Sequence, residues 1–470
     1  MVAERFDTES ARAFTHLLKG NLGAGCLALP LVFARLGTGG ALGLFAVVAL
    51  QGTYSMVLIV RCKHAVRAHG LKAQTYEDIG EIAFGAVGRR LIGALVVALQ
   101  LGVCCIYISL LVTNVHAGVP AVPERAVFLA VSCVCALLSL LRGLSDLWLL
   151  STTANAIMLT AIATAVGVSL RVLAARDGPA EPIERRVTAA TVARCLSVEF
   201  FAYEGIALVL PVENAFSPFR PGTGTRTSPG VEMLAAHGGD GAAAQLPAAA
   251  DGHAPSADGS AGLVEGLEAA EERRARRFEA LLVAAMGCVA LLFVLLGSSV
   301  AAAFPHIDSG SVTAFLAERE DAGWWLPAVN ALVSLAVLLT YPLQLQPAAM
   351  IFDRLCAPPP AVGKPSGWHG PAFVARRVGI TAACVFVVFL VPALELLIAL
   401  LGALCQASLA LLPFALSLKL HRLGLVTFSR TRTAVHVVLM AFCGCAMLVG
   451  TYSAIADIAA FRAAGSALRL

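Results

Sequence analysis

The chain has 470 residues, of which 58% are hydrophobic and 14% charged, and its mean hydropathy is +0.81. This composition excludes an ordinary soluble globular protein, and the small net charge of +4 gives no reason to expect a nucleic-acid partner. Cysteine and histidine spacings typical of metal sites are missing, so we expect no metal and no other cofactor.

A membrane-spanning helix needs about 20 apolar residues, and the sequence contains about eleven runs of that kind. In the first half we predict helices 1–6 at about 12–33, 39–60, 91–115, 126–141, 147–173 and 190–211. The polar loop predicted between helices 2 and 3 gathers the basic residues Arg61, Lys63, Arg67, Lys72, Arg89 and Arg90.

The segment 216–277 is rich in Gly, Ala, Pro and Ser and cannot bury a core, so most of it is predicted to be disordered. Its end, 265–277, is predicted to form a short charged helix, with Glu272 and Arg276 spaced i,i+4. Helices 7–11 follow at about 278–303, 325–352, 372–391, 394–418 and 433–459. The expected organisation is an N-terminal tail (1–11), helices 1–6 (12–215), a loop (216–277), helices 7–11 (278–460) and a C-terminal tail (461–470).

The distribution of Lys and Arg predicts the orientation. If the N-terminus is cytoplasmic, the loops on its side hold most of the basic residues, as the positive-inside rule requires. The loop after helix 5 is the weak point, because its basic residues fall on the outer side. These are Arg171, Arg176, Arg185 and Arg186. We therefore expect a cytoplasmic N-terminus, a cytoplasmic loop at 216–277 and a C-terminus on the opposite face.

Helix 1 contains the stretch KGNLGAGCLALP (19–30), with three glycines followed by a proline. Each glycine costs about 1 kcal/mol of helix propensity relative to alanine. A helix broken at mid-membrane leaves backbone groups unpaired, which is tolerable only inside protein or beside a polar cavity. Such breaks mark the binding sites of secondary transporters. The alternative is a small-residue face that packs closely on a neighbouring helix.

Helix 6 carries a second interruption, in which Glu204 is followed by Gly205 and then by Pro211. A carboxylate at mid-membrane depth costs several kcal/mol unless it is paired, protonated or facing water. Helices 1 and 6 occupy corresponding positions in two five-helix halves, which indicates an inverted repeat with a binding site between the halves. A purely structural hydrogen bond between helices is the alternative role for Glu204.

These motifs resemble the amino acid/auxin permease family, and within it the proton-coupled branch with vacuolar and lysosomal members. The resemblance depends on HLLKGNLG (16–23) with LP (29–30), and on YEG (203–205) with LPVEN (210–214). Weaker agreement covers 100–102, Cys104, Tyr107, 114–115, 154–155, 158–159, 339–344 and 347–348. Two departures are the enlarged loop between helices 6 and 7, and Gln346 where relatives usually have an aromatic residue.

The resemblance implies an all-α integral membrane protein of eleven transmembrane helices. Its fold would be the five-plus-five inverted repeat, with helices 1 and 6 unwound at mid-membrane. It also implies transport of small amino acids, commonly coupled to protons.

An amino acid zwitterion in a dry pocket needs hydrogen bonds for both of its charges. The unpaired N–H groups at a helix break suit the carboxylate, and free carbonyl groups suit the ammonium. We therefore expect Tyr107 to donate its hydroxyl to the carboxylate, although a bond to a neighbouring helix is the alternative. Asn155 is more typical of interhelical contact, and Tyr341 is a further candidate for the pocket lining. The predicted substrate-binding residues are Gly20, Gly23, Ala24, Gly25, Tyr107, Phe201, Tyr203, Gly205 and Gln344.

The groups eligible to carry a coupling proton are His16, Glu204 and Glu199, and we expect His16 and Glu204 to do so. Histidine changes charge near neutral pH, and Glu204 lies deep enough in helix 6 to be shielded from water. The alternatives are an interfacial role for His16 and pairing of the buried glutamate with Lys19. Glu395 lies near the outer end of helix 10 and is expected to be interfacial.

The sequence therefore predicts a secondary active transporter that moves small neutral amino acids by alternating access, coupled to protons. Sodium coupling, or exchange, is one alternative. A second is an amino acid sensor whose loop at 216–277 binds a cytoplasmic partner. An enzyme is disfavoured because HExxH and GxSxG motifs are missing, and a channel because no filter-like loop occurs. The resemblance favours the vacuolar or lysosomal membrane or the plasma membrane.

Overall fold

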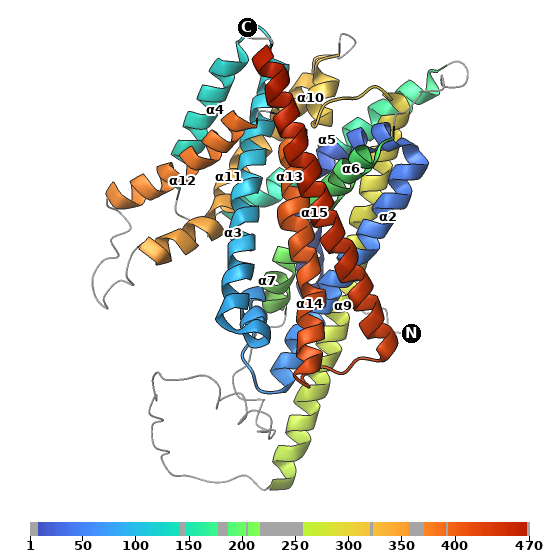
Figure 1. The fold of residues 1–470 in the computed structure, drawn as a ribbon, viewed down its shortest axis with the longest axis vertical. Helices are drawn as coiled ribbons and strands as arrows, with labels where there is room; N and C mark the ends of the chain where they lie inside the picture. The colour runs from blue at the N-terminus through green and yellow to red at the C-terminus, as the bar shows by residue number, and fades with distance from the viewer. Residues whose placement is uncertain are drawn as a thin grey trace.

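The computed structural model describes residues 8–141, 147–176, 187–203, 205–216, 257–319, 323–356, 371–391 and 393–467. Within these ranges every regular element is a helix (Figure 1). Nine helical stretches in the described residues are long and apolar enough to cross a membrane. The protein is therefore an all-helical, multi-pass membrane protein by length and composition.

The first half of the chain forms seven helices. They are α1 (Thr8–Asn21), α2 (Ala24–Ala68), α3 (Tyr76–Gly118), α4 (Glu124–Leu138), α5 (Leu147–Ala174), α6 (Ala189–Ala202) and α7 (Ile206–Phe216). With 15 residues, α4 is about 22 Å long, shorter than the roughly 30 Å hydrocarbon layer, and it is not one of the nine candidate spans.

The second half consists of α9 (Ala257–Ala303), α10 (Val312–Ala317), α11 (Trp325–Cys356), α12 (Pro371–Leu390), α13 (Leu394–Leu401), the π-helix η1 (Gly402–Gln406), α14 (Ala407–Arg422) and α15 (Arg430–Ala467). The charged stretch 265–277, predicted as a separate short helix, is continuous with the following span in α9. The part of the predicted disordered loop at 217–256 lies outside the described residues. Neither α10 nor η1 was predicted.

The prediction of a long polar loop between helices 2 and 3 is wrong. Helix α2 continues to Ala68 and α3 already begins at Tyr76, so only a short turn separates them. Thr75 and Asp78 form a capping box: the Asp78 N–H donates to the Thr75 hydroxyl (3.2 Å), and the Thr75 N–H donates to the Asp78 carboxylate (3.0 Å). This cap starts α3 well before its apolar run, which hydropathy alone could not reveal.

Helix α2 contains a kink at Gly37, whose φ of 76° is readily accessible only to glycine. The kink at Gly37 falls between the predicted end of helix 1, at about residue 33, and the predicted start of helix 2, at about residue 39. Every residue from 24 to 34 is buried, so the first part of α2 forms the centre of the bundle, where it packs against α6 and α9. On the other side, α3 packs along α11, and the first turns of α9 project past the other helices at the lower end of Figure 1.

Candidate substrate site

The first break in the bundle lies between α1 and α2, at Leu22 and Gly23. Gly23 is extended (φ −139°, ψ −162°) and precedes the first turn of α2, where Cys26 N–H donates to the Gly23 carbonyl (3.3 Å). The first N–H groups of a helix have no carbonyl partner within it. The start of α2, at Ala24, therefore directs unpaired donors and the positive end of a helix dipole into the centre of the bundle.

The second break separates α6 from α7. Helix α6 ends at Ala202, where the Tyr203 N–H still donates to the Glu199 carbonyl (3.0 Å). Helix α7 starts after Gly205, whose carbonyl accepts the Leu208 N–H (3.0 Å). Glu204, a predicted proton-carrying residue, lies outside the described residues. The last carbonyls of α6 are therefore acceptors next to the break.

The two breaks lie side by side, and three of the predicted glycines make the closest contacts there. A methyl group on Gly25 would come within 2.7 Å of Ala202 Cα, and one on Gly20 within 2.4 Å of a Leu208 methyl. A methyl group on Gly205 would lie 3.1 Å from the Asn21 side-chain nitrogen. In this conformation these glycines permit close helix packing, and neighbouring residues occupy the space beside them.

Gly23 has a different environment. The nearest atom to a methyl group placed there is the Tyr107 hydroxyl, at 3.8 Å. Tyr107, from α3, is partly buried beside the core. The Tyr107 hydroxyl thus lies beside the non-helical backbone at Gly23, where the first N–H donors of α2 begin.

Tyr203 was predicted to bind substrate, but its hydroxyl has two protein partners. It donates to the Met286 carbonyl of α9 (2.9 Å) and lies 3.0 Å from the Thr53 hydroxyl of α2. Its ring packs edge-on against Phe45, with ring centroids 5.7 Å apart. These contacts fix the end of α6 to α2 and α9, so the side chain anchors the break in this conformation. Phe201, also a predicted ligand, is buried against Gly25.

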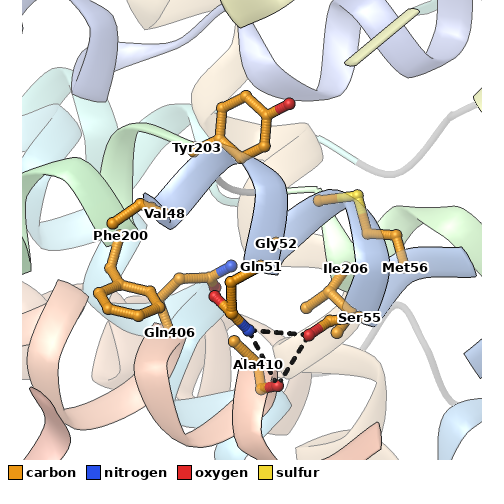
Figure 2. Close-up of a pocket in the computed structure, with 10 residues that line it drawn as sticks. All are labelled: Val48, Gln51, Gly52, Ser55, Met56, Phe200, Tyr203, Ile206, Gln406 and Ala410. Atoms are coloured by element: carbon orange, nitrogen blue, oxygen red, sulfur yellow. Dashed lines mark hydrogen bonds between the residues drawn. The ribbon is translucent and has the colours of Figure 1, made fainter. Parts of the chain in front are cut away.

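A small cavity of about 10 Å³ lies below the second break, between α2, α6, α7, η1 and α14 (Figure 2). The Gln51 amide donates to the Ser55 hydroxyl (2.8 Å), and both side chains reach the Ala410 carbonyl. The side-chain oxygens of Gln51 and Gln406 are buried and accept no hydrogen bond from the described residues. The cavity has room for one water molecule, which these oxygens would bind. Sequence analysis missed this site, although π-helices often occur at functional positions.

The remaining predicted residues are spread over the bundle. Gln344 of α11 donates to the Gln100 side chain of α3, so its amide is engaged across those two helices. Tyr341 is fully buried and donates to Thr381 (3.4 Å). Asn155 is partly buried on α5, and His16 is exposed on α1, before the first break.

Comparison with known proteins identifies the family. The family described as "Transmembrane amino acid transporter protein" matches residues 8–218 and 269–456, which include both breaks. The chain belongs to this family. It is also similar to the "Proton-coupled amino acid transporter-like protein pathetic" of Drosophila melanogaster, with 25% identity over 480 residues, covering 96% of this chain and 85% of the relative. The family is one of transporters and not of enzymes, and the resemblance stated from the sequence motifs is confirmed.

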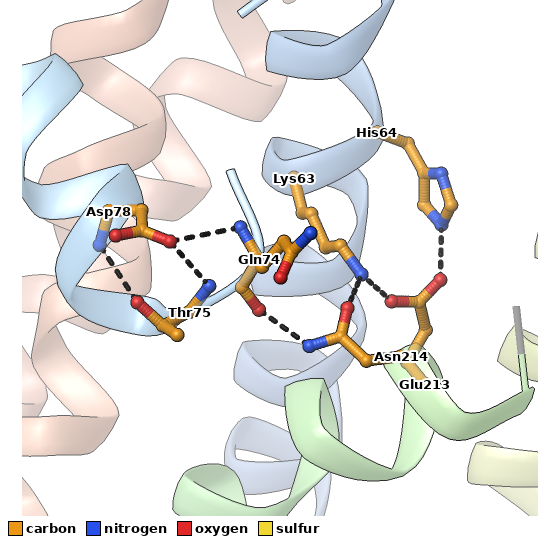
Figure 3. A network of polar contacts seen from close by, with 7 residues as sticks. All are labelled: Lys63, His64, Gln74, Thr75, Asp78, Glu213 and Asn214. Atoms are coloured by element: carbon orange, nitrogen blue, oxygen red, sulfur yellow. Dashed lines mark hydrogen bonds and ion pairs between the residues drawn. The ribbon is translucent and has the colours of Figure 1, made fainter. Parts of the chain in front are cut away.

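In this amino acid transporter, the far end of α7 is held by a buried polar network that the sequence did not reveal (Figure 3). Lys63 of α2 pairs with the carboxylate of Glu213 and donates to the Asn214 side chain. His64 Nε2 lies 3.2 Å from the other Glu213 oxygen. The Asn214 amide donates to the Gln74 carbonyl (2.8 Å), in the turn before α3. The network ties the lower half of the broken helix to α2 and to the start of α3.

Proposed function

We propose that this protein is a secondary active transporter that moves small neutral amino acids across a membrane by alternating access, coupled to protons. The main observation in support is that the two helix breaks lie next to each other, beside the hydroxyl of Tyr107. The amino acid carboxylate would accept hydrogen bonds from the start of α2 and from Tyr107. The ammonium group would donate to the last carbonyls of α6.

The contacts on either side of the breaks supply the two gates. Gly25 touches Ala202, where α2 meets α6, and Gly20 touches Leu208, where α1 meets α7. Both contacts are made in this structure, as expected of an occluded state. Alternating access requires one contact to part while the other is kept, so that the space beside Gly23 opens to one face at a time.

The proposed architecture is eleven transmembrane helices in a five-plus-five inverted repeat, in which the α1–α2 break and the α6–α7 break are counterparts. In the proposed orientation of the protein in the membrane, the N-terminus lies in the cytoplasm. The resemblance to the proton-coupled branch supports the vacuolar or lysosomal membrane or the plasma membrane. The similarity to the proton-coupled amino acid transporter-like protein of Drosophila melanogaster supports coupling to protons over sodium.

The test is uptake by purified protein in liposomes across a panel of amino acids, first with an imposed pH difference and then with sodium replaced by another cation. We expect glycine, alanine, serine or proline to accumulate on the alkaline side without sodium. Strict sodium dependence would reject proton coupling. Specific binding without any uptake or exchange would favour a sensor.

A further inference from the structure

Glu199 has an environment unlike that of any other described carboxylate in the bundle. It lies on α6, and its backbone carbonyl accepts the last hydrogen bond of that helix, from the Tyr203 N–H (3.0 Å). Its side chain is 0% exposed, and both carboxyl oxygens lack a hydrogen-bond partner among the described residues. An ionised carboxylate in such surroundings is very costly, because nothing replaces the water it has lost.

The elements packed against α6 offer the Glu199 carboxyl no ion pair within the described part of the chain. On α6 itself, Arg194 pairs with Asp457 of α15 (2.6 Å). Helix α6 packs against α2, α13, η1 and α15. Leaving aside the last turns of α2 around Lys63, these five elements carry the following ionisable groups: Arg194, Cys195 and Tyr203 of α6; Cys26, Arg35 and Tyr54 of α2; Glu395 of α13; Cys405 of η1; and Arg430, Arg432, His436, Cys443, Cys445, Tyr452, Asp457 and Arg462 of α15.

Glu213 shows how the same fold treats a carboxylate that stays charged. That side chain is equally buried, yet it has Lys63 and His64 beside it. A buried charge is tolerated when a counter-charge and hydrogen bonds accompany it. The fold provides both for Glu213 and neither for Glu199, so the two carboxyl groups are suited to different tasks.

We propose that Glu199 is the binding site for the coupling proton. This inference rests on the proposed function above. While the site is open to the proton-rich face, the Glu199 carboxylate takes a proton from a hydronium ion. An O–H bond of that ion breaks, an O–H bond to the carboxylate forms, and neutral water is left. The neutral acid then allows α2 and α6 to close over the loaded substrate. On the opposite face the O–H bond breaks and the proton leaves to water with the amino acid.

The coupling follows from burial. In this closed conformation Gly25 lies against Ala202 and Glu199 has no exposed surface, so the closed bundle holds the carboxyl group away from water. The ionised form resists closure over the substrate and the neutral form does not, so the substrate-loaded carrier changes sides only after it has taken up a proton. The empty carrier returns deprotonated, with water in the vacated substrate space around the carboxylate. Glu199 is positioned for this role by its place one helical turn before the break.

The experiment uses the full-length protein in liposomes, with wild type, Glu199→Gln, Glu199→Asp and, as a matched control on another helix, Glu395→Gln. Exchange of internal for external amino acid at equal pH reports substrate binding and the conformational cycle. Accumulation driven by an imposed pH difference reports proton coupling. Glutamine imitates the neutral acid, so we expect Glu199→Gln to fold and exchange like wild type but to lose pH-driven accumulation. Glu395→Gln should keep both activities, and Glu199→Asp should keep part of the accumulation.

The outcomes are separable. If wild type exchanges amino acids but shows no pH-driven accumulation, the proposed proton coupling itself fails. If wild type accumulates and Glu199→Gln accumulates equally well, another group carries the proton and this inference is overturned. It is also overturned if Glu199→Gln does not fold, because that result would make the side chain a structural element that its neutral analogue cannot replace.

Discussion

The buried pair of Lys63 and Glu213 allows a sharp prediction about the stability of the broken helix. The two side chains are 1% and 0% exposed, so neither can recover its hydration when the other is removed. Replacing Lys63 with methionine leaves the Glu213 carboxylate buried, with His64 as its remaining ion-pair partner among the described residues. Breaking a buried pair in this way costs roughly 3–5 kcal/mol of unfolding free energy. Glu213→Gln should cost a similar amount, because it leaves a buried ammonium group.

The double variant Lys63→Met/Glu213→Gln contains no unpaired buried charge. We therefore expect its stability to lie within about 2 kcal/mol of wild type, well short of the sum of the single losses. The pair between Arg61 and Glu279 is the matched control, since it also starts from α2, at 2.7 Å, but its side chains are 55% and 20% exposed. Arg61→Met should cost less than about 1 kcal/mol.

Reversible unfolding of the detergent-solubilised protein by SDS, followed by circular dichroism, measures all four variants. Transport in liposomes adds a second readout, because a detached α7 would misplace the lower side of the break. Single variants should lose uptake and the double variant should recover part of it. The reasoning is refuted if Lys63→Met is as mild as Arg61→Met, or if the single losses simply add in the double variant.

Further substitutions separate substrate binding from packing. Tyr107→Phe should raise KM for the amino acid about tenfold or more, because a hydrogen bond to a charged group is worth about 1.5–3 kcal/mol, and uptake kinetics measure it. Gly25→Ala should abolish uptake by holding α2 away from α6, while cross-linking between the two helices falls. Gly402→Ala places a methyl group 1.8 Å from the Ser197 carbonyl and should cost about 3 kcal/mol or more, whereas Gly287→Ala meets nothing within 4 Å and should fold like wild type.

Most of the helices could be predicted because about 20 apolar residues in a row have few alternatives to a membrane span. The interruptions were also visible, since Gly23 and Gly205 are weak helix formers at the places where α1 and α6 end. The ends of α2 and α3 could not be predicted from hydropathy. They extend through basic residues that hydropathy assigns to a loop, and a side-chain cap at Thr75 sets the start of α3.

The candidate site was less accessible to sequence reasoning. Lys63 and Glu213 are separated by 150 positions, and only the fold brings them together. The same is true of Gln51 and Gln406, which single-sequence patterns cannot pair. Tyr203 is a different case. Its place at the break suggested a ligand, but in this conformation its hydroxyl is occupied by α2 and α9.

The glycines at the two breaks combine the two interpretations that the sequence left open. Gly25 approaches the Ala202 backbone so closely that a methyl group would not fit, and at Gly20 a methyl group would require the end of the Leu208 side chain to move, which is the packing interpretation. Gly23, between them, faces a tyrosine hydroxyl across ordinary contact distance, which suits a ligand. A carrier needs both kinds of position in one stretch, because the helices must seal tightly on each side of a space that they do not fill. A single added methyl group should therefore block closure at Gly25 and reduce binding at Gly23.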